Sequence, residues 1–259
     1  MNQPAEADRD ETQRQDPWQS KLATILPLVA FFSCGVFIDT SPLDDGQNVN
    51  PTAYLVLVIA RVVLMSGLVL FFWAKIRSMF PLAIDAWGWL VGLVGGVLWI
   101  SVCSLGWEQS IWDAIAQSSF GQQALGLLAA PRRDAVNPFD TYTQAGLLVC
   151  FLFFRFTLLA LCVPIAEELM LRGCLMRAVE TEDWTELPLT RVGRFGVLAV
   201  LAYAAVSHPG EWIAALLWFS LVTWLMFKTG KFWNCVLAHC VTNLMLGIYV
   251  CWFGQWQLW

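Results

Sequence analysis

The fold class of this chain is decided by residues 145–165, which read AGLLVCFLFFRFTLLALCVPI. Arg155 is the only charged residue in this stretch. A helix that crosses a lipid bilayer needs about 20 consecutive apolar residues, and this run supplies that length. The sequence therefore predicts a membrane-spanning helix here.

Similar apolar runs recur along the whole chain. Of its 259 residues, 58% are hydrophobic and only 14% are charged, which is far more apolar than a soluble domain. The further runs are 22–38, 53–74, 86–105, 195–207, 213–227 and 232–253. Together they predict an all-α, polytopic transmembrane bundle of about seven to eight helices. The net charge of −5 is small, and nothing indicates a nucleic-acid partner.

The chain is expected to have three parts. Residues 1–20 are polar and predict a disordered cytoplasmic tail, not a secretory signal, because their charged region is too long. Residues 21–142 would hold the N-terminal transmembrane helices and a long polar loop, in which residues 111–130 suggest an amphipathic interfacial helix. Residues 143–259 would form the remaining helical core. The eight cysteines are scattered without a CxxC pair and are interpreted as buried small hydrophobic residues.

The basic residues that flank the apolar runs predict an orientation in the membrane. They all fall on one side if the N-terminus is cytoplasmic and the C-terminus is outside. They are Arg14, Lys21, Lys75, Arg77, Arg172, Arg177, Arg191, Arg194, Lys228 and Lys231. Arg132 and Arg133 are exceptions, but they lie in a long loop, where the rule has less force.

A few polar groups lie in strongly apolar sequence. His208 and His239 are the only histidines, and Glu167-Glu168 and Asn243 share their apolar surroundings. Such groups are costly to place inside a membrane, so they indicate a functional site by default. All of them lie in the last hundred or so residues, on three different predicted helices.

Helical spacing groups these residues further. Glu168 and Arg172 are four residues apart and can form an ion pair within one helix, while Glu167 points about 100° away. His239 and Asn243 are also four apart and share a helix face. Hydropathy places the two glutamates near the cytoplasmic side and His208 deeper. We therefore expect a tilted or broken helix around Pro164 to bring them level.

Purely structural interpretations exist for each group. The glutamates can mark a helix boundary, His208 can end a helix before Pro209-Gly210, and His239 with Asn243 can join two helices by a hydrogen bond. Because the groups occur together and no other histidine exists, we favour a catalytic site. A carboxylate and a histidine can activate a water, and a second histidine and an amide can stabilise an oxyanion. This chemistry is hydrolysis of a peptide or amide bond without a covalent nucleophile.

The motifs resemble those of a known family. The segment AEELMLRG, residues 166–173, resembles the EExxxR motif of the CAAX-protease and bacteriocin-processing (CPBP) intramembrane proteases, also called the Rce1-like or Abi family. His208 is similar to the histidine of the family's second motif. LAHCVTNL, residues 237–244, is similar to its HxxxN motif. The family often has phenylalanine four residues before the second-motif histidine, where this chain has Ala204. The chain also resembles the CAAX-protease-related proteins that accompany bacterial exosortase systems.

The resemblance implies roles for the matching residues. Glu167 and His208 would activate the water, His239 and Asn243 would form the oxyanion site, and Glu168 and Arg172 would support the first motif. Residues 143–259 would then be the catalytic core of an intramembrane endopeptidase in a bacterial inner membrane. Its substrate would be a membrane protein or a lipidated peptide. We favour a site without cofactor or metal; a zinc ion held by Glu167, His208 and His239 stays open, with Glu168 or Asn243 completing the set.

Two other functions remain open. One is a non-catalytic membrane scaffold with the same fold, in which the motif residues would tolerate substitution. The other is a small proton-coupled transporter, but no inverted repeat is visible and the polar groups cluster in one half of the chain. Two further features have structural interpretations. Arg61 and Arg155 are each expected to pair with a carboxylate or with backbone carbonyls inside the bundle, or to extend toward the membrane surface; binding of a substrate carboxylate is the alternative. The glycines between Leu90 and Gly96 are expected to allow close helix packing.

Overall fold

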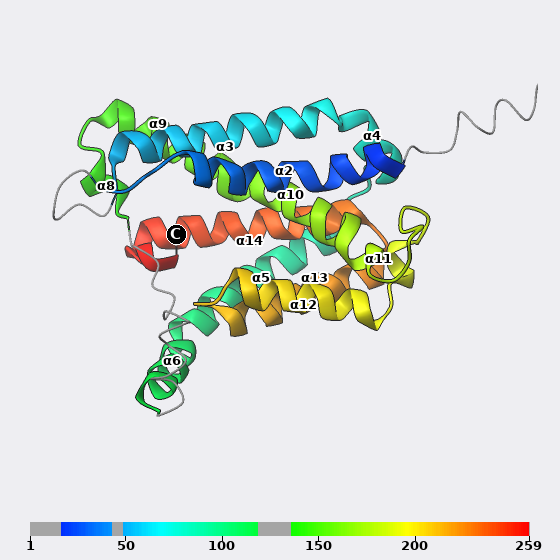
Figure 1. The fold of residues 1–259 in the computed structure, drawn as a ribbon. Coiled ribbons are helices and arrows are strands. Elements are labelled where there is room, and N and C mark those ends of the chain that lie inside the picture. Colours follow the sequence, from blue (N-terminus) through cyan, green and yellow to red (C-terminus); the bar gives the residue numbers. More distant parts are fainter. Residues whose placement is uncertain (1–16, 43–48, 119–135, 259) are drawn as a thin grey trace, which may run out of the picture.

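The computed structural model describes residues 17–42, 49–118 and 136–258, and over these ranges the chain is helical, with no strand (Figure 1). The long helices are α2 (Pro17–Phe37), α3 (Pro51–Phe71), α5 (Ala86–Ser104), α12 (Arg194–Ser207), α13 (Trp212–Thr229) and α14 (Phe232–Phe253). A further helix runs without a break from Ala145 to Ala178. It consists of α9 (Ala145–Thr157), η1 (Leu158–Cys162), α10 (Val163–Met170), η2 (Leu171–Leu175) and α11 (Met176–Ala178). The short elements are α4 (Trp73–Met79), α6 (Trp107–Gln117), α8 (Pro138–Thr141), η3 (Leu189–Arg191) and η4 (Trp256–Leu258).

Each predicted apolar run forms a helix in the structure. In the described part of the chain, six helices are long and apolar enough to cross a membrane, and α12 is a shorter apolar helix. The prediction of a polytopic helical bundle is therefore confirmed, and the protein is an integral, multi-pass membrane protein.

Two predicted boundaries need correction. Helix α2 begins at Pro17, so the prediction of a disordered tail was wrong for residues 17–20, and Ser20 is fully buried. Residues 1–16 lie outside the described residues. The long loop contains a helix, α6, which begins at Trp107 and ends at Gln117, so it starts earlier than the predicted range. Its position at the membrane interface stays a prediction. The expected continuation beyond residue 118 lies outside the described part of the chain.

Helix α14 lies at the centre of the bundle, with α2, α3 and α10 on one side and α5, α12 and α13 on the other (Figure 1). The basic segments α4 and α11 lie at the same end of the bundle as the turn between α13 and α14. The basic residues of these three segments therefore lie at one end of the bundle, which is where the orientation argument places them. Which side of the membrane this end faces remains a prediction.

The glycines of α5 allow this helix to lie against α14. A Cβ atom added at Gly92 would lie 2.7 Å from the Cβ of Val241 and 2.9 Å from the carbonyl oxygen of Ala238. The hydroxyl of Thr242 on α14 donates a 2.9 Å hydrogen bond to the carbonyl oxygen of Gly92. The backbones of α5 and α14 therefore lie closer together than a residue with a Cβ atom at position 92 would permit. The predicted role of these glycines in close helix packing is confirmed.

A polar cluster joins α5 and α14 at the end where both helices begin. Asp85 caps α5, since its carboxylate accepts a 3.0 Å hydrogen bond from the backbone N–H of Trp87. The same carboxylate accepts hydrogen bonds from Lys231 (2.8 Å) and from the side-chain amide of Asn234 (2.9 Å) at the start of α14. The hydrogen bond from Lys231 lowers the pKa of Asp85. The register between α5 and α14 is thereby set at one end by polar contacts and along its length by glycines.

We expect Gly92→Ala to destabilise the protein. The added methyl group would collide with α14, and overpacking of this kind costs about 1–3 kcal/mol. The measurement is the apparent melting temperature of the purified protein in detergent. Gly67→Ala in α3 is the matched control, because a Cβ there meets nothing within 4 Å. A Gly92→Ala protein that melts no lower than the Gly67→Ala protein would contradict the packing argument.

Candidate active site

Pro164 changes the shape of the helix that carries the two glutamates. In the π-helical segment η1, the N–H of Val163 donates to the carbonyl oxygen of Leu158, five residues back. Pro164 has no N–H to offer the next carbonyl, that of Leu159. The side-chain amide of Asn243 on α14 fills this gap with a 3.0 Å hydrogen bond to the Leu159 oxygen. A tilted or broken helix was expected around Pro164. The helix is not broken there but widened into a π-helical turn, and the carbonyl group that this turn leaves without an N–H partner is bound by Asn243 on α14.

Glu168 lies in the interior behind the site. Its Oε1 accepts a 2.7 Å hydrogen bond from Nη1 of Arg172, and both side chains are fully buried. The ion pair predicted from their spacing is confirmed. The same oxygen lies 3.0 Å from Nδ1 of His239. The Glu168 carboxylate is thus shared by an arginine of its own helix and a histidine of α14.

The tautomer of His239 follows from this contact. A carboxylate paired with an arginine is an acceptor, so Nδ1 of His239 carries the proton that it donates to Glu168. The other ring nitrogen, Nε2, lies 3.7 Å from Oε2 of Glu167. Trp218 packs on the ring with 4.5 Å between centroids and is itself held by a 3.0 Å hydrogen bond to Thr242. The imidazole is therefore fixed in orientation, with Nε2 on the side of Glu167.

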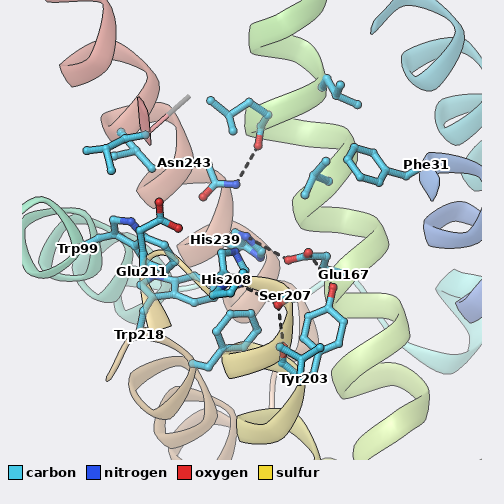
Figure 2. Close-up of a pocket in the computed structure, with 18 of the residues that line it drawn as sticks. Phe31, Trp99, Glu167, Tyr203, Ser207, His208, Glu211, Trp218, His239 and Asn243 are labelled. Atoms are coloured by element: carbon cyan, nitrogen blue, oxygen red, sulfur yellow. Dashed lines mark hydrogen bonds and ion pairs between the residues drawn. The ribbon is translucent and has the colours of Figure 1, made fainter. Parts of the chain in front are cut away.

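Glu167 points away from Glu168, as helical spacing predicts. Its Oε1 accepts a 2.9 Å hydrogen bond from the hydroxyl of Tyr203 on α12. Its Oε2 is the oxygen on the side of His239. Figure 2 shows this carboxylate between Tyr203 and His239. Glu167 lies on α10, Tyr203 on α12 and His239 on α14.

His208 follows the last residue of α12. Its Nδ1 lies 2.8 Å from the hydroxyl oxygen of Ser207. Its ring packs edge-on against Trp99, with 5.3 Å between centroids, and against Phe219 at 5.9 Å. The aromatic rings hold the imidazole on the side of the cavity formed by α5 and α13 (Figure 2).

A cavity of about 860 Å³ joins these groups. Glu167, His208, His239 and Asn243, the four residues predicted to be catalytic, all line it. Most of the other lining residues are aliphatic or aromatic, and Arg155 and Glu211 add charged groups to the wall. Glu168 and Arg172 are not among the lining residues, which fits their predicted supporting role. Arg61, which is half-buried, donates a 3.0 Å hydrogen bond to the carbonyl oxygen of Phe31.

Sequence reasoning missed two residues of the site. Tyr203 contacts the Glu167 carboxylate, and Trp218 packs on His239. The only signal for Tyr203 was a polar aromatic residue in an apolar helix, five residues before His208. The neighbouring Ala204, where the family often has phenylalanine, is fully buried and does not line the cavity. The difference from the family pattern at Ala204 therefore concerns the packing behind the cavity wall.

The site contains carboxylate and imidazole groups of the kind that bind metal ions. Among the described residues, no group of three or more histidine, cysteine, aspartate or glutamate side chains has the arrangement of a metal site. In particular, Nδ1 of His239 is directed at Glu168. The zinc alternative with Glu167, His208 and His239 would therefore have to use Nε2 of His239.

Comparison with known proteins agrees with the motifs. Residues 149–245 match the family model for Rce1-like type II CAAX prenyl endopeptidases. The matched region contains all the residues of the three motifs, from Glu167 to Asn243. The chain therefore carries an Rce1-like domain over these residues. No curated protein and no solved structure matches the chain.

Proposed function

We propose that this protein is an intramembrane endopeptidase that hydrolyses a peptide bond in a membrane-associated or lipidated protein. One observation carries the proposal: the carboxylate of Glu167 lies in a largely apolar cavity whose wall also contains His208, His239 and Asn243. A carboxylate with one oxygen tied to Tyr203 and the other facing a histidine is suited to orient and deprotonate a water. The Rce1-like domain supports the same reaction class.

In the proposed reaction, Glu167 is the general base. It accepts a proton from the water through Oε2, and His208, which lines the same cavity, binds the same water. The water oxygen attacks the scissile carbonyl carbon and forms a tetrahedral intermediate. Glu167 then returns the proton to the leaving amine, so that the cycle ends with the site unchanged.

His239 and Asn243 would stabilise the oxyanion of this intermediate. One proton of the Asn243 amide is used by the Leu159 carbonyl, which leaves the other for the oxyanion. Since Nδ1 of His239 donates to Glu168, donation from Nε2 requires the doubly protonated ring. Glu168 and Arg172 would act behind the cavity by fixing this ring, because they do not line the cavity themselves.

The cavity favours an apolar substrate. A volume of about 860 Å³ lies within the range of sites that enclose drug-sized ligands, about 300–1,000 Å³. Its largely aliphatic and aromatic wall would hold apolar side chains or a lipid chain next to the scissile bond. We further propose that the protein lies in a bacterial inner membrane with its N-terminus in the cytoplasm, as the grouping of basic residues at one end of the bundle favours.

The first experiment compares the N-termini of membrane proteins in cells that express the wild-type, Glu167→Gln or His208→Ala protein at matched levels. Glu182→Gln in the exposed loop before α12 is the control. New termini with the wild-type and Glu182→Gln proteins alone would support the protease and would identify its substrate. Identical profiles from all four proteins would overturn the proposal and favour a scaffold with the same fold.

We expect cleavage to proceed without a metal ion. The polar groups of the site are already bound to one another, Glu167 to Tyr203 and His239 to Glu168. Treatment of the purified protein with EDTA or 1,10-phenanthroline should leave the cleavage rate unchanged. A loss of activity that added zinc restores would instead support the site formed by Glu167, His208 and His239.

Tyr203→Phe is expected to slow cleavage without unfolding the protein. The variant loses the hydrogen bond that orients Glu167, and a hydrogen bond to a charged group contributes about 1.5–3 kcal/mol, or roughly 10-fold to 100-fold in rate. Tyr249→Phe, which removes a hydroxyl away from the cavity, is the matched control. Equal rates for the two variants would show that Tyr203 does not act through Glu167.

A further inference from the structure

The position of His208 depends on a short turn between α12 and α13. His208 follows α12 with φ −126° and ψ 59°, and its carbonyl oxygen accepts a 3.1 Å hydrogen bond from the N–H of Glu211. Pro209 and Gly210 lie between them, and α13 begins at Trp212. The direction of the imidazole is therefore set by a turn outside regular helix.

Helix α13 does not cap its own first turn. The first N–H groups of a helix have no partner within the helix, and a nearby side-chain oxygen usually accepts from them. Glu211, at the N-cap position, makes no side-chain hydrogen bond of this kind. Instead, Oε1 of Glu108 on α6 accepts from the N–H groups of Ile213 (2.6 Å) and Ala214 (3.2 Å).

This contact is local in space but distant in sequence. Glu108 lies 105 residues before Ile213, and its side chain is buried with only 5% of the residue exposed. A carboxylate at the N-terminus of a helix is also favoured by the helix dipole. Glu108 thus provides both the acceptor and the charge that the start of α13 needs.

A second residue of α6 holds the other side of the turn. Nε1 of Trp112 donates a 3.1 Å hydrogen bond to the carbonyl oxygen of Pro209, the residue after His208. Trp112 is four residues after Glu108, so both side chains leave the same face of α6. Together they bind Pro209 within the turn and the N–H groups of Ile213 and Ala214 just after it.

We propose that Glu108 and Trp112 are positioning residues, and that α6 acts as a clamp on the His208–Glu211 turn. The two side chains never reach the cavity, but they fix the backbone that carries His208. A misplacement of about 1 Å can cost about 100-fold in rate, so a loosened turn should lower catalysis more than binding. The consequence for catalysis rests on the proposed function of His208, whereas the clamp itself does not.

Hydrogen exchange of the full-length protein in detergent tests the clamp directly. The variants are Glu108→Ala, Glu108→Gln and Trp112→Phe, and Gln109→Ala on the exposed face of α6 is the control. Glutamine keeps an acceptor oxygen at the same place, so it should restore protection that alanine removes. We expect faster exchange of peptides covering residues 208–214 in Glu108→Ala and Trp112→Phe, with the rest of the bundle unchanged.

The kinetic measurement uses the substrate identified by its new terminus. We expect kcat to fall about 10-fold in Glu108→Ala with KM unchanged, and Glu108→Gln to recover most of the loss. Unchanged exchange across residues 208–214 would overturn the clamp. Faster exchange with unchanged kcat would overturn the positioning role. If the wild-type protein cleaves nothing, the proposed function has failed, and the exchange result alone then supports or overturns the clamp.

Discussion

Glu167→Gln is expected to reduce cleavage by about 10²–10⁴-fold, the contribution typical of a general base. The substitution removes the ability to accept and return a proton. It keeps an oxygen that can accept the hydrogen bond from Tyr203, so the cavity should keep its shape. The expected result is thus a stable protein with almost no activity.

The measurement is the rate at which the purified protein forms the new N-terminus of its substrate. Glu182→Gln controls for the loss of one carboxylate at an exposed position, and its rate should match the wild type. The melting temperature of Glu167→Gln should lie close to that of the wild type. A folded Glu167→Gln protein that retains a large fraction of wild-type activity would rule out Glu167 as the base.

The two adjacent glutamates are expected to respond differently because their surroundings differ. Glu167 lines the cavity and binds an uncharged hydroxyl, whereas Glu168 is fully buried against Arg172 and His239. One hundred degrees of helical rotation separates the group proposed to act on substrate from the group proposed to orient the histidine. We therefore expect the two adjacent glutamates to serve different functions from two faces of one helix.

Much of this arrangement could be predicted from the sequence. Hydropathy located each long helix, since lipid-facing helices must be apolar throughout. The spacing of four residues predicted the Glu168–Arg172 pair, and it placed His239 and Asn243 on one face. These predictions succeeded because they depend only on the geometry of a single helix.

The contacts between helices could not be predicted in this way. Pro164 was expected to accompany a tilted or broken helix, but a π-helical turn accommodates it and Asn243 binds the exposed carbonyl of Leu159. Glu108 caps a helix that begins about a hundred residues later, so no local pattern relates the two. Tyr203 reaches Glu167 across a helix interface. Each of these depends on which helices are neighbours, which periodicity does not specify.

Arg172→Leu is expected to cause the largest loss of stability. The Glu168 carboxylate would remain fully buried without the guanidinium that compensates its charge. Breaking a buried ion pair by removing one partner costs about 3–5 kcal/mol. The apparent melting temperature in detergent should fall sharply, and the control Arg191→Leu, at an exposed position, should melt like the wild type.

The double variant Glu168→Leu/Arg172→Leu separates stability from function. Replacing both members of a buried ion pair with apolar residues is often neutral or stabilising, so the double variant should melt well above Arg172→Leu. The double variant should nevertheless be inactive, because Nδ1 of His239 loses its acceptor and the ring is no longer fixed toward Glu167. A double variant as unstable as the single one would show that Arg172 acts mainly through its 3.4 Å hydrogen bond to the Phe219 carbonyl. A stable and active double variant would show that His239 does not need Glu168, and the proposed order of contacts from Arg172 through Glu168 to His239 would be wrong.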